Sequence, residues 1–149
     1  MNIAGLVCYR PGDRPRLIYR TRLYRGRKGE SKALTWTDYR DLLVAAHQQL
    51  GGPIVLVWDN LNVHKVPPMQ KFIDEHADWL TVFHLPTYAP DLNPAESIWS
   101  MLKAGLTNFA ATNANHLVRT VKRQLKMIQY RESLVNGCLT QTGLIIEPA

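Results

Sequence analysis

The feature that most constrains the fold is a five-residue apolar run, Ile54–Trp58, which lies between two helical patterns. The run does not alternate with polar residues, as is typical of a strand covered on both faces. A helical pattern between Thr35 and Gly51 precedes it, and Pro67 opens another after it. A further buried strand is expected over residues 80–85. Strands that alternate with helices predict an α/β domain with parallel strand pairing.

The two ends of the sequence complete this pattern. Residues 3–9 and 16–24 read as two strands of a hairpin, joined by a turn rich in proline and glycine. Asn93-Pro94 is a typical helix start, and we expect that helix to run to about residue 109. A last helix is expected over residues 114–129. Residues 1–149 are enough for one domain with a single core.

Several classes of protein are excluded by composition. Cys8 and Cys138 form neither a disulfide framework nor a zinc-ligand spacing, so we interpret them as small apolar residues in a reducing cytoplasm. The longest apolar run is five residues, which is too short to cross a membrane. The first residues lack the pattern of a signal peptide.

The positive charge is concentrated at the N-terminus. Residues 1–35 carry nine basic and two acidic residues, a net charge of +7, whereas the remainder carries nine basic and ten acidic residues. Alternation along the second strand places Arg16, Arg20 and Arg22 on one face with Ile18. Such a face can follow a phosphate backbone, and a solvated hairpin or a contact with an acidic group is the alternative.

Asp59 is the first candidate for a catalytic residue, because it directly follows the apolar strand. Ligands in open α/β sheets collect beyond the carboxyl ends of the strands, where a carboxylate has a rigid support and still reaches solvent. A turn or helix-capping aspartate is the alternative. Asn60 and His64 flank Asp59 and are candidates for positioning a water molecule or a phosphate.

Glu96 is the second candidate, in the first turn of the helix that Asn93 opens. Its position also fits a capping box with Asn93, which would make it structural. At 100° per residue, however, Glu96 lies away from the apolar stripe, and Lys103 lies two turns along on the same face as Glu96. An exposed acid for a metal and a cation for a phosphate would then share one strip of the helix.

These residues belong to a recognisable pattern. Its parts, in order, are Val55-Leu56-Val57-Trp58-Asp59-Asn60, His64, Leu85-Pro86-Thr87-Tyr88-Ala89-Pro90-Asp91-Leu92-Asn93-Pro94-Ala95-Glu96, Trp99 and Leu102-Lys103. The pattern resembles the C-terminal part of the catalytic domain of DDE transposases, in the bacterial insertion-sequence branch related to the mariner transposases.

The resemblance implies a ribonuclease-H-like fold, a mixed sheet flanked by helices, and DNA strand cleavage and transfer that depends on Mg²⁺ or Mn²⁺. Asp59 matches the second catalytic acid of the family and Glu96 the third, with Asn60 and His64 in support. Carboxylate oxygens suit such hard cations. The partner implied is DNA, in the bacterial nucleoid, and the complete protein is expected to be a homo-oligomer.

The chain departs from the family at its start. The first catalytic acid of the family precedes the strand expected at 3–9, where this sequence has only Met1 and Asn2, and Asp13 lies in a turn. We therefore expect an N-terminally truncated domain that also lacks the helix-turn-helix and does not cleave DNA alone. An upstream transposase segment or a frameshift partner would supply the rest. The alternative is a non-catalytic remnant that at most binds nucleic acid through its basic hairpin.

Overall fold

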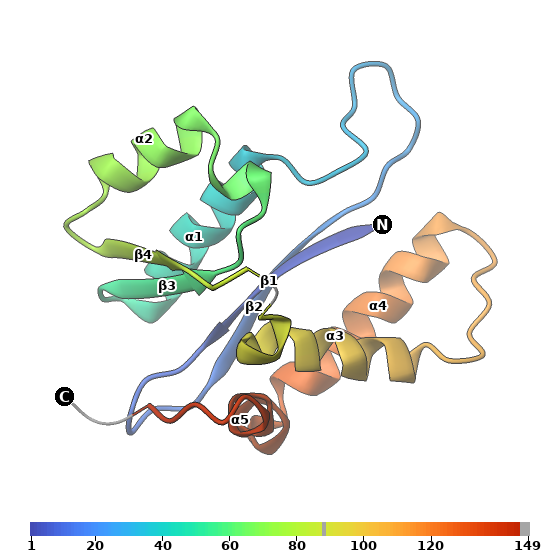
Figure 1. The fold of residues 1–149 in the computed structure, drawn as a ribbon. Coiled ribbons are helices and arrows are strands. Elements are labelled where there is room, and N and C mark those ends of the chain that lie inside the picture. The colour runs from blue at the N-terminus through green and yellow to red at the C-terminus, as the bar shows by residue number, and fades with distance from the viewer. Residues whose placement is uncertain (88, 147–149) are drawn as a thin grey trace. The chain divides into compact units, whose positions relative to one another are not determined.

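A computed structural model describes residues 1–87 and 89–146. The elements follow one another as β1 (Asn2–Cys8), β2 (Arg16–Arg22), α1 (Trp36–Leu50), β3 (Ile54–Trp58), α2 (Pro67–Glu75), β4 (Leu80–His84), α3 (Pro94–Gly105), α4 (Ala114–Gln129) and α5 (Glu132–Gln141). Short 3₁₀ helices lie at Asn62–His64 and Pro90–Leu92. The predicted α/β class is confirmed (Figure 1). Among the described residues, no helix is long and apolar enough to cross a membrane.

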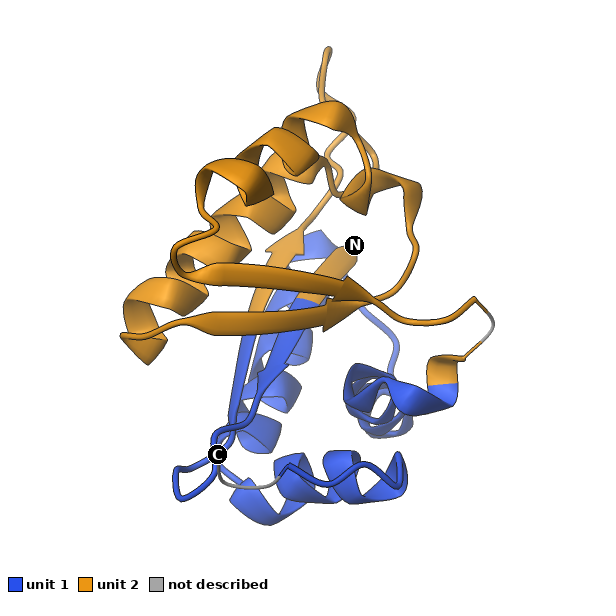
Figure 2. Ribbon diagram, turned by 60° about the vertical axis from the view of Figure 1, so that its left-hand side comes forward, with its two compact units in different colours: residues 1, 5–18, 91–149 blue, residues 2–4, 19–90 orange. Residues whose placement is uncertain are grey.

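The chain divides into two compact units, which Figure 2 distinguishes by colour. The first contains residues 1, 5–18 and 91–149, and the second contains residues 2–4 and 19–90. The β1–β2 pair has residues in both units, and β3–β4 forms a separate two-stranded sheet in the second unit.

The second unit is built on the parallel pair of β3 and β4, as the sequence predicts. Ile54 pairs with Leu80, and the register continues to Trp58 opposite His84. Helices α1 and α2 lie along one face of this pair (Figure 1). Leu56 and Trp58 point to that side and are buried.

The prediction that both faces of β3 and β4 are covered is wrong. Val55 and Val57 are 67% and 52% exposed, and Phe83 of β4 is 58% exposed. The physical reason is that α1 and α2 supply a helical layer for one face of this two-stranded sheet. An uninterrupted apolar run indicates a strand, but it does not show what covers each of its faces.

The ends of α1 follow from local chemistry. Thr35 is the N-cap, and Asp38 at the third helical position completes a capping box. At the other end Gly51 has φ +68° and donates its N–H to the carbonyl of His47 at 2.9 Å. A glycine adopts this left-handed conformation at little cost, which explains why the helix ends here.

The first unit packs helices α3, α4 and α5 against one another. Ile98, Leu125 and Val135, one from each helix, are fully buried. The hydroxyl of Tyr9 donates to the carbonyl of Val135 at 2.7 Å, which connects the end of β1 to α5. Helix α4 has the predicted bounds, and α5 is an addition that the sequence reading misses.

Helix α3 ends at Gly105 rather than near residue 109 as expected. The chain turns directly after it, because the N–H of Leu106 bonds to the carbonyls of Leu102 and Lys103 and Asn108 adopts φ +64°. Asn108 is the one non-glycine residue of the described chain with positive φ. Asparagine tolerates this conformation better than most residues, so it stops the helical pattern.

Candidate active site

Asp59 lies directly after β3, at the carboxyl end of the parallel pair. Its side chain is 49% exposed. Its Oδ1 accepts a hydrogen bond from the N–H of Leu61 at 3.3 Å, which closes a turn. The side chain is thus fixed at one oxygen and open to solvent, so it combines the turn role with an accessible carboxylate.

His64 holds Asp59 from the buried side. Its Nδ1 lies 3.2 Å from both the backbone oxygen and Oδ1 of Asp59. The imidazole ring stacks on Trp58 with centroids 3.9 Å apart, and its other neighbour is Tyr39, edge-on at 4.7 Å. These contacts bury His64 almost completely, with 5% exposed.

The protonation state of His64 follows from this environment. Burial lowers the pKa of His64 below its ordinary value of 6.5, although the neighbouring Asp59 acts to raise it. The ring is therefore neutral at pH 7, and its proton lies on Nδ1, which faces two oxygen acceptors. Nε2 is buried and has no hydrogen-bond partner in the described part of the chain. His64 thus donates to Asp59 without carrying a charge.

Two further residues tie the ends of β3 and β4 together beside Asp59. The side-chain amide of Asn60 donates to the carbonyl of Leu85 at 2.9 Å. The Nδ1 of His84 lies 3.4 Å from the backbone oxygen of Asp59. His84 is a neighbour that the sequence reading missed. Its position as the last residue of β4, opposite Trp58 in register, is the signal that could have found it.

Glu96 lies in the first turn of α3 and is exposed. The N-cap role belongs to Asn93, whose side chain accepts from the N–H of Ala95 at 3.1 Å. Among residues 1–87 and 89–146, the Glu96 carboxylate makes no hydrogen bond or ion pair, so the capping-box alternative is not formed. Lys103 is exposed as well, while Ile98 is buried. The predicted division of α3 into an apolar and a polar face is confirmed.

Asp59 and Glu96 belong to different compact units. The segment between β4 and α3 contains Tyr88, which lies outside the described residues. Within the described residues, no three His, Cys, Asp or Glu side chains form a group that could hold a metal ion. The two accessible carboxylates nevertheless match the hard oxygen donors that Mg²⁺ and Mn²⁺ prefer.

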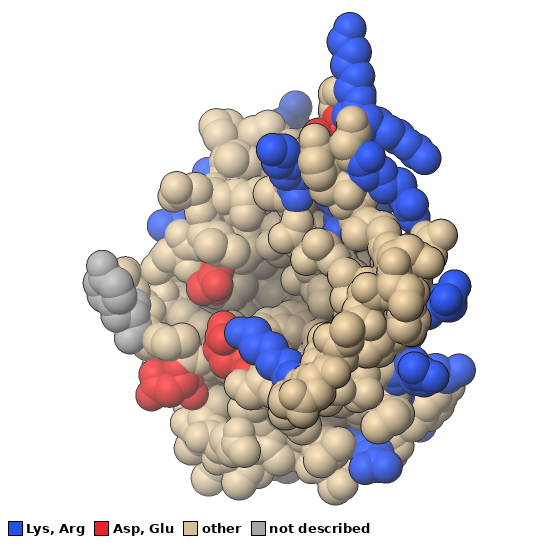
Figure 3. All heavy atoms as spheres, turned by 90° about the vertical axis from the view of Figure 1, so that its right-hand side faces the viewer, with Lys and Arg blue, Asp and Glu red and all other residues tan. Residues whose placement is uncertain are grey.

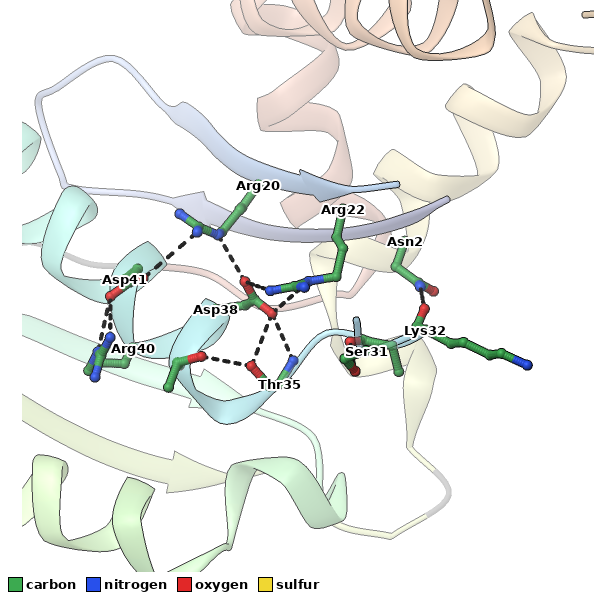
Figure 4. Close-up of polar contacts among 11 residues, drawn as sticks. Asn2, Arg20, Arg22, Ser31, Lys32, Thr35, Asp38, Arg40 and Asp41 are labelled. Atoms are coloured by element: carbon green, nitrogen blue, oxygen red, sulfur yellow. Dashed lines mark hydrogen bonds and ion pairs between the residues drawn. The ribbon is translucent and has the colours of Figure 1, made fainter. Parts of the chain in front are cut away.

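The arginines of β2 make a different contact from the one that alternation suggests. Arg20 and Arg22 both bind Asp38, which is buried at the start of α1 (Figure 4). The Nη2 of Arg22 lies 2.9 Å from Oδ1 of Asp38, and Nε of Arg20 lies 3.2 Å from the same oxygen. Of the alternatives, the contact with an acidic group is thus the one that the structure contains for these two arginines.

The expected arrangement of β2 is wrong in its first half. Leu17 and Ile18 are both buried, so the strand does not alternate between a wet and an apolar face there. One reason is that this half of β2 lies in the helical first unit, where Gln129 of α4 donates to the carbonyl of Leu17 at 2.7 Å. Arg16 is half-buried and has interactions of its own.

A comparison with known protein families identifies the superfamily to which the chain belongs. The family model described as DDE superfamily endonuclease matches residues 28–118, well over half of the chain. The match includes Asp59, His64, Glu96 and Lys103. The chain belongs to the DDE superfamily of endonucleases, whose substrate is DNA. No curated protein matches it.

Proposed function

We propose that this chain is the catalytic part of a transposase of the bacterial insertion-sequence branch related to the mariner transposases. It would cut and join DNA strands, with Asp59 as the second acid of the site and Glu96 as the third. The observation that carries the proposal is the state of the two carboxylates. Asp59 is held at the end of a parallel strand by His64 and remains half-exposed, while Glu96 is exposed on α3.

We propose a separate role for each residue of the site. Asp59 and Glu96 would hold Mg²⁺ or Mn²⁺, and His64 and Asn60 would keep Asp59 and the end of β3 in place. A bound divalent ion supplies stabilisation of the charge on the phosphate that is being cut. Lys103, on the exposed face of α3, would contact a neighbouring phosphate.

We also propose that the β1–β2 and β3–β4 sheets are parts of one ribonuclease-H-like sheet. In that fold, a strand bearing the first acid of the site lies between them. The exposed Val55, Val57 and Phe83 support this proposal, because a sheet with helices on both faces covers such side chains. The assembled enzyme would act as a homo-oligomer.

Arg16, Arg20 and Arg22 are proposed to contribute to DNA binding. Arg20 and Arg22 are 45% and 29% exposed, so they offer part of their surface to a phosphate backbone while they bind Asp38. The linked ion pairs here join three guanidinium groups, of Arg20, Arg22 and Arg40, to the two carboxylates of Asp38 and Asp41, which leaves a net charge of +1.

The metal site is tested by calorimetric titration of Mn²⁺ into the chain. We expect weak binding that both Asp59→Asn and Glu96→Gln remove, because either variant leaves too few anionic oxygens. Asp78→Asn is a matched control, since Asp78 is exposed and follows α2. Unchanged Mn²⁺ affinity in both site variants would overturn the assignment and favour the non-catalytic alternative.

A further inference from the structure

The loop of residues 23–35, which connects β2 to α1, is anchored at both of its ends to one carboxylate. Arg22 at the end of β2 donates to Asp38 at 2.9 Å. Thr35 at the start of α1 donates its backbone N–H to Asp38 at 2.8 Å (Figure 4). Asp38 is 2% exposed, so this anchor is shielded from water. The loop therefore begins and ends at fixed positions.

The loop is also organised internally around its acid, Glu30. The two carboxylate oxygens of Glu30 accept the backbone N–H groups of Arg25 and Arg27, at 3.0 and 3.2 Å. These hydrogen bonds lower the pKa of Glu30, with the bond from Arg25 as the largest cause. Gly26 and Gly29 have φ of +78° and +77°, a conformation that suits glycine, and they allow the turns. Glu30, the one acidic residue of the loop, thus binds the backbone of the loop itself.

The cations of the loop are exposed. Arg27 and Lys28 lie in an exposed run at the tip. Lys32 is exposed too, and its ammonium group lies 5.5 Å from the centre of the Tyr24 ring, while its carbonyl accepts from the side chain of Asn2 at 2.6 Å. Figure 3 shows basic side chains gathered over this loop, at the top of the face drawn.

We infer that this anchored basic loop is the principal surface by which the chain binds the phosphate backbone of duplex DNA. The choice of DNA as the polyanion rests on the proposed function. Arg20 and Arg22 of β2 already bind a buried carboxylate, whereas Arg27, Lys28 and Lys32 of the loop are exposed on a backbone that Glu30 and Asp38 hold in place. Preorganised cations bind a regular row of phosphates with a smaller loss of conformational entropy.

The inference is tested by fluorescence anisotropy with a labelled duplex of random sequence, over a series of salt concentrations and in the presence of EDTA. The chelator removes divalent ions, so the result does not depend on the metal site. The loop variant combines Arg27→Gln, Lys28→Gln and Lys32→Gln. The matched control removes the same number of exposed cations from α4, with Arg119→Gln, Lys122→Gln and Arg123→Gln.

We expect the loop variant to flatten the plot of log K against log salt by roughly 0.9 for each phosphate that the protein no longer binds, up to about 2.7. The α4 variant should keep the slope of the unmodified chain. An unchanged slope in the loop variant, or an equal flattening in the α4 variant, would overturn the inference. A failure of Mn²⁺ binding in the titration above would leave this slope unchanged, so the two proposals fail separately.

Discussion

Replacement of Asp38 by asparagine is the perturbation that best tests how the N-terminal half of the chain is stabilised. Asp38 is buried and accepts hydrogen bonds from Arg20, Arg22 and the backbone of Thr35. Burial alone would raise the pKa of this carboxyl group. The hydrogen bonds from Arg22, Thr35 and Arg20 outweigh burial and lower the pKa from 3.8 to about 2.

The size of the stabilisation by Asp38 follows from the difference between its folded and unfolded pKa values. A carboxyl group that titrates near 2 when folded and near 3.8 when unfolded contributes about 2 kcal/mol to the free energy of unfolding at neutral pH. Arg20 and Arg22 are partly exposed and can turn to water once their partner is neutral, so the loss stays below the roughly 3–5 kcal/mol of a fully buried pair. We therefore expect Asp38→Asn to lower the melting temperature by about 4–8 °C.

The contribution of Asp38 to the free energy of unfolding should also depend on pH. Because the folded pKa is depressed, the stabilisation by Asp38 is complete above about pH 4–5 and is lost as the pH falls towards 2. Urea unfolding of the unmodified chain across this range should show the loss, and Asp38→Asn should show a shallower pH dependence there. Asp38 should thus account for a distinct part of the fall in the free energy of unfolding at low pH.

Asp41→Asn is the control, because its side chain is 40% exposed and its ion pairs with Arg40 and Arg20 lie at the surface. Such pairs contribute about 0–1 kcal/mol. If Asp38→Asn and Asp41→Asn unfold at the same denaturant concentration and have the same acid dependence, the contacts of Asp38 with Arg20, Arg22 and Thr35 do not stabilise the fold as described.

Three glycine substitutions separate backbone conformation from packing. Gly51→Ala should lower the free energy of unfolding by about 1 kcal/mol in urea titrations, because Gly51 has φ +68° but open space around its Cα. Gly5→Ala should cost about 1–3 kcal/mol, since its Cβ would lie 2.8 Å from Cη2 of Trp99, and thermal melting measures the loss. Gly137→Ala, inside α5 with open space around it, should instead raise stability by about 0.5–1 kcal/mol, and a destabilised variant would contradict this account of α5.

Local signals predicted the parts of the fold that depend on a few neighbouring residues. The caps at Thr35 and Gly51 and the Asn93-Pro94 start of α3 are chemistry of adjacent residues, and the structure confirms them. Helix α5 was missed because Val135 and Cys138 are its only buried residues and the helix-weakening Asn136-Gly137 separates them. A ten-residue helix with so few apolar positions depends on packing against α3 and α4, which the sequence does not display.

In the candidate site, too, local features could be predicted from the sequence and contacts between distant residues could not. The exposure of Asp59 and Glu96 could be predicted, since a strand end and a helical face are local features. The pairing of Arg20 and Arg22 with Asp38 could not, because the residues are 18 and 16 positions apart and belong to a strand and a helix. The contact between His64 and Asp59 depends on the turn between them and on the burial of His64 against Trp58.

Paramagnetic broadening by Mn²⁺ in amide NMR spectra tests directly the proposal that Asp59 and Glu96 hold one metal ion. If one ion binds both carboxylates, amide signals around both residues should broaden together at the lowest Mn²⁺ concentrations, and Asp59→Asn should restore both sets of signals. Asp78→Asn should leave the broadening in place. Broadening around one residue alone, or signals around Glu96 that still broaden in Asp59→Asn, would contradict the shared site.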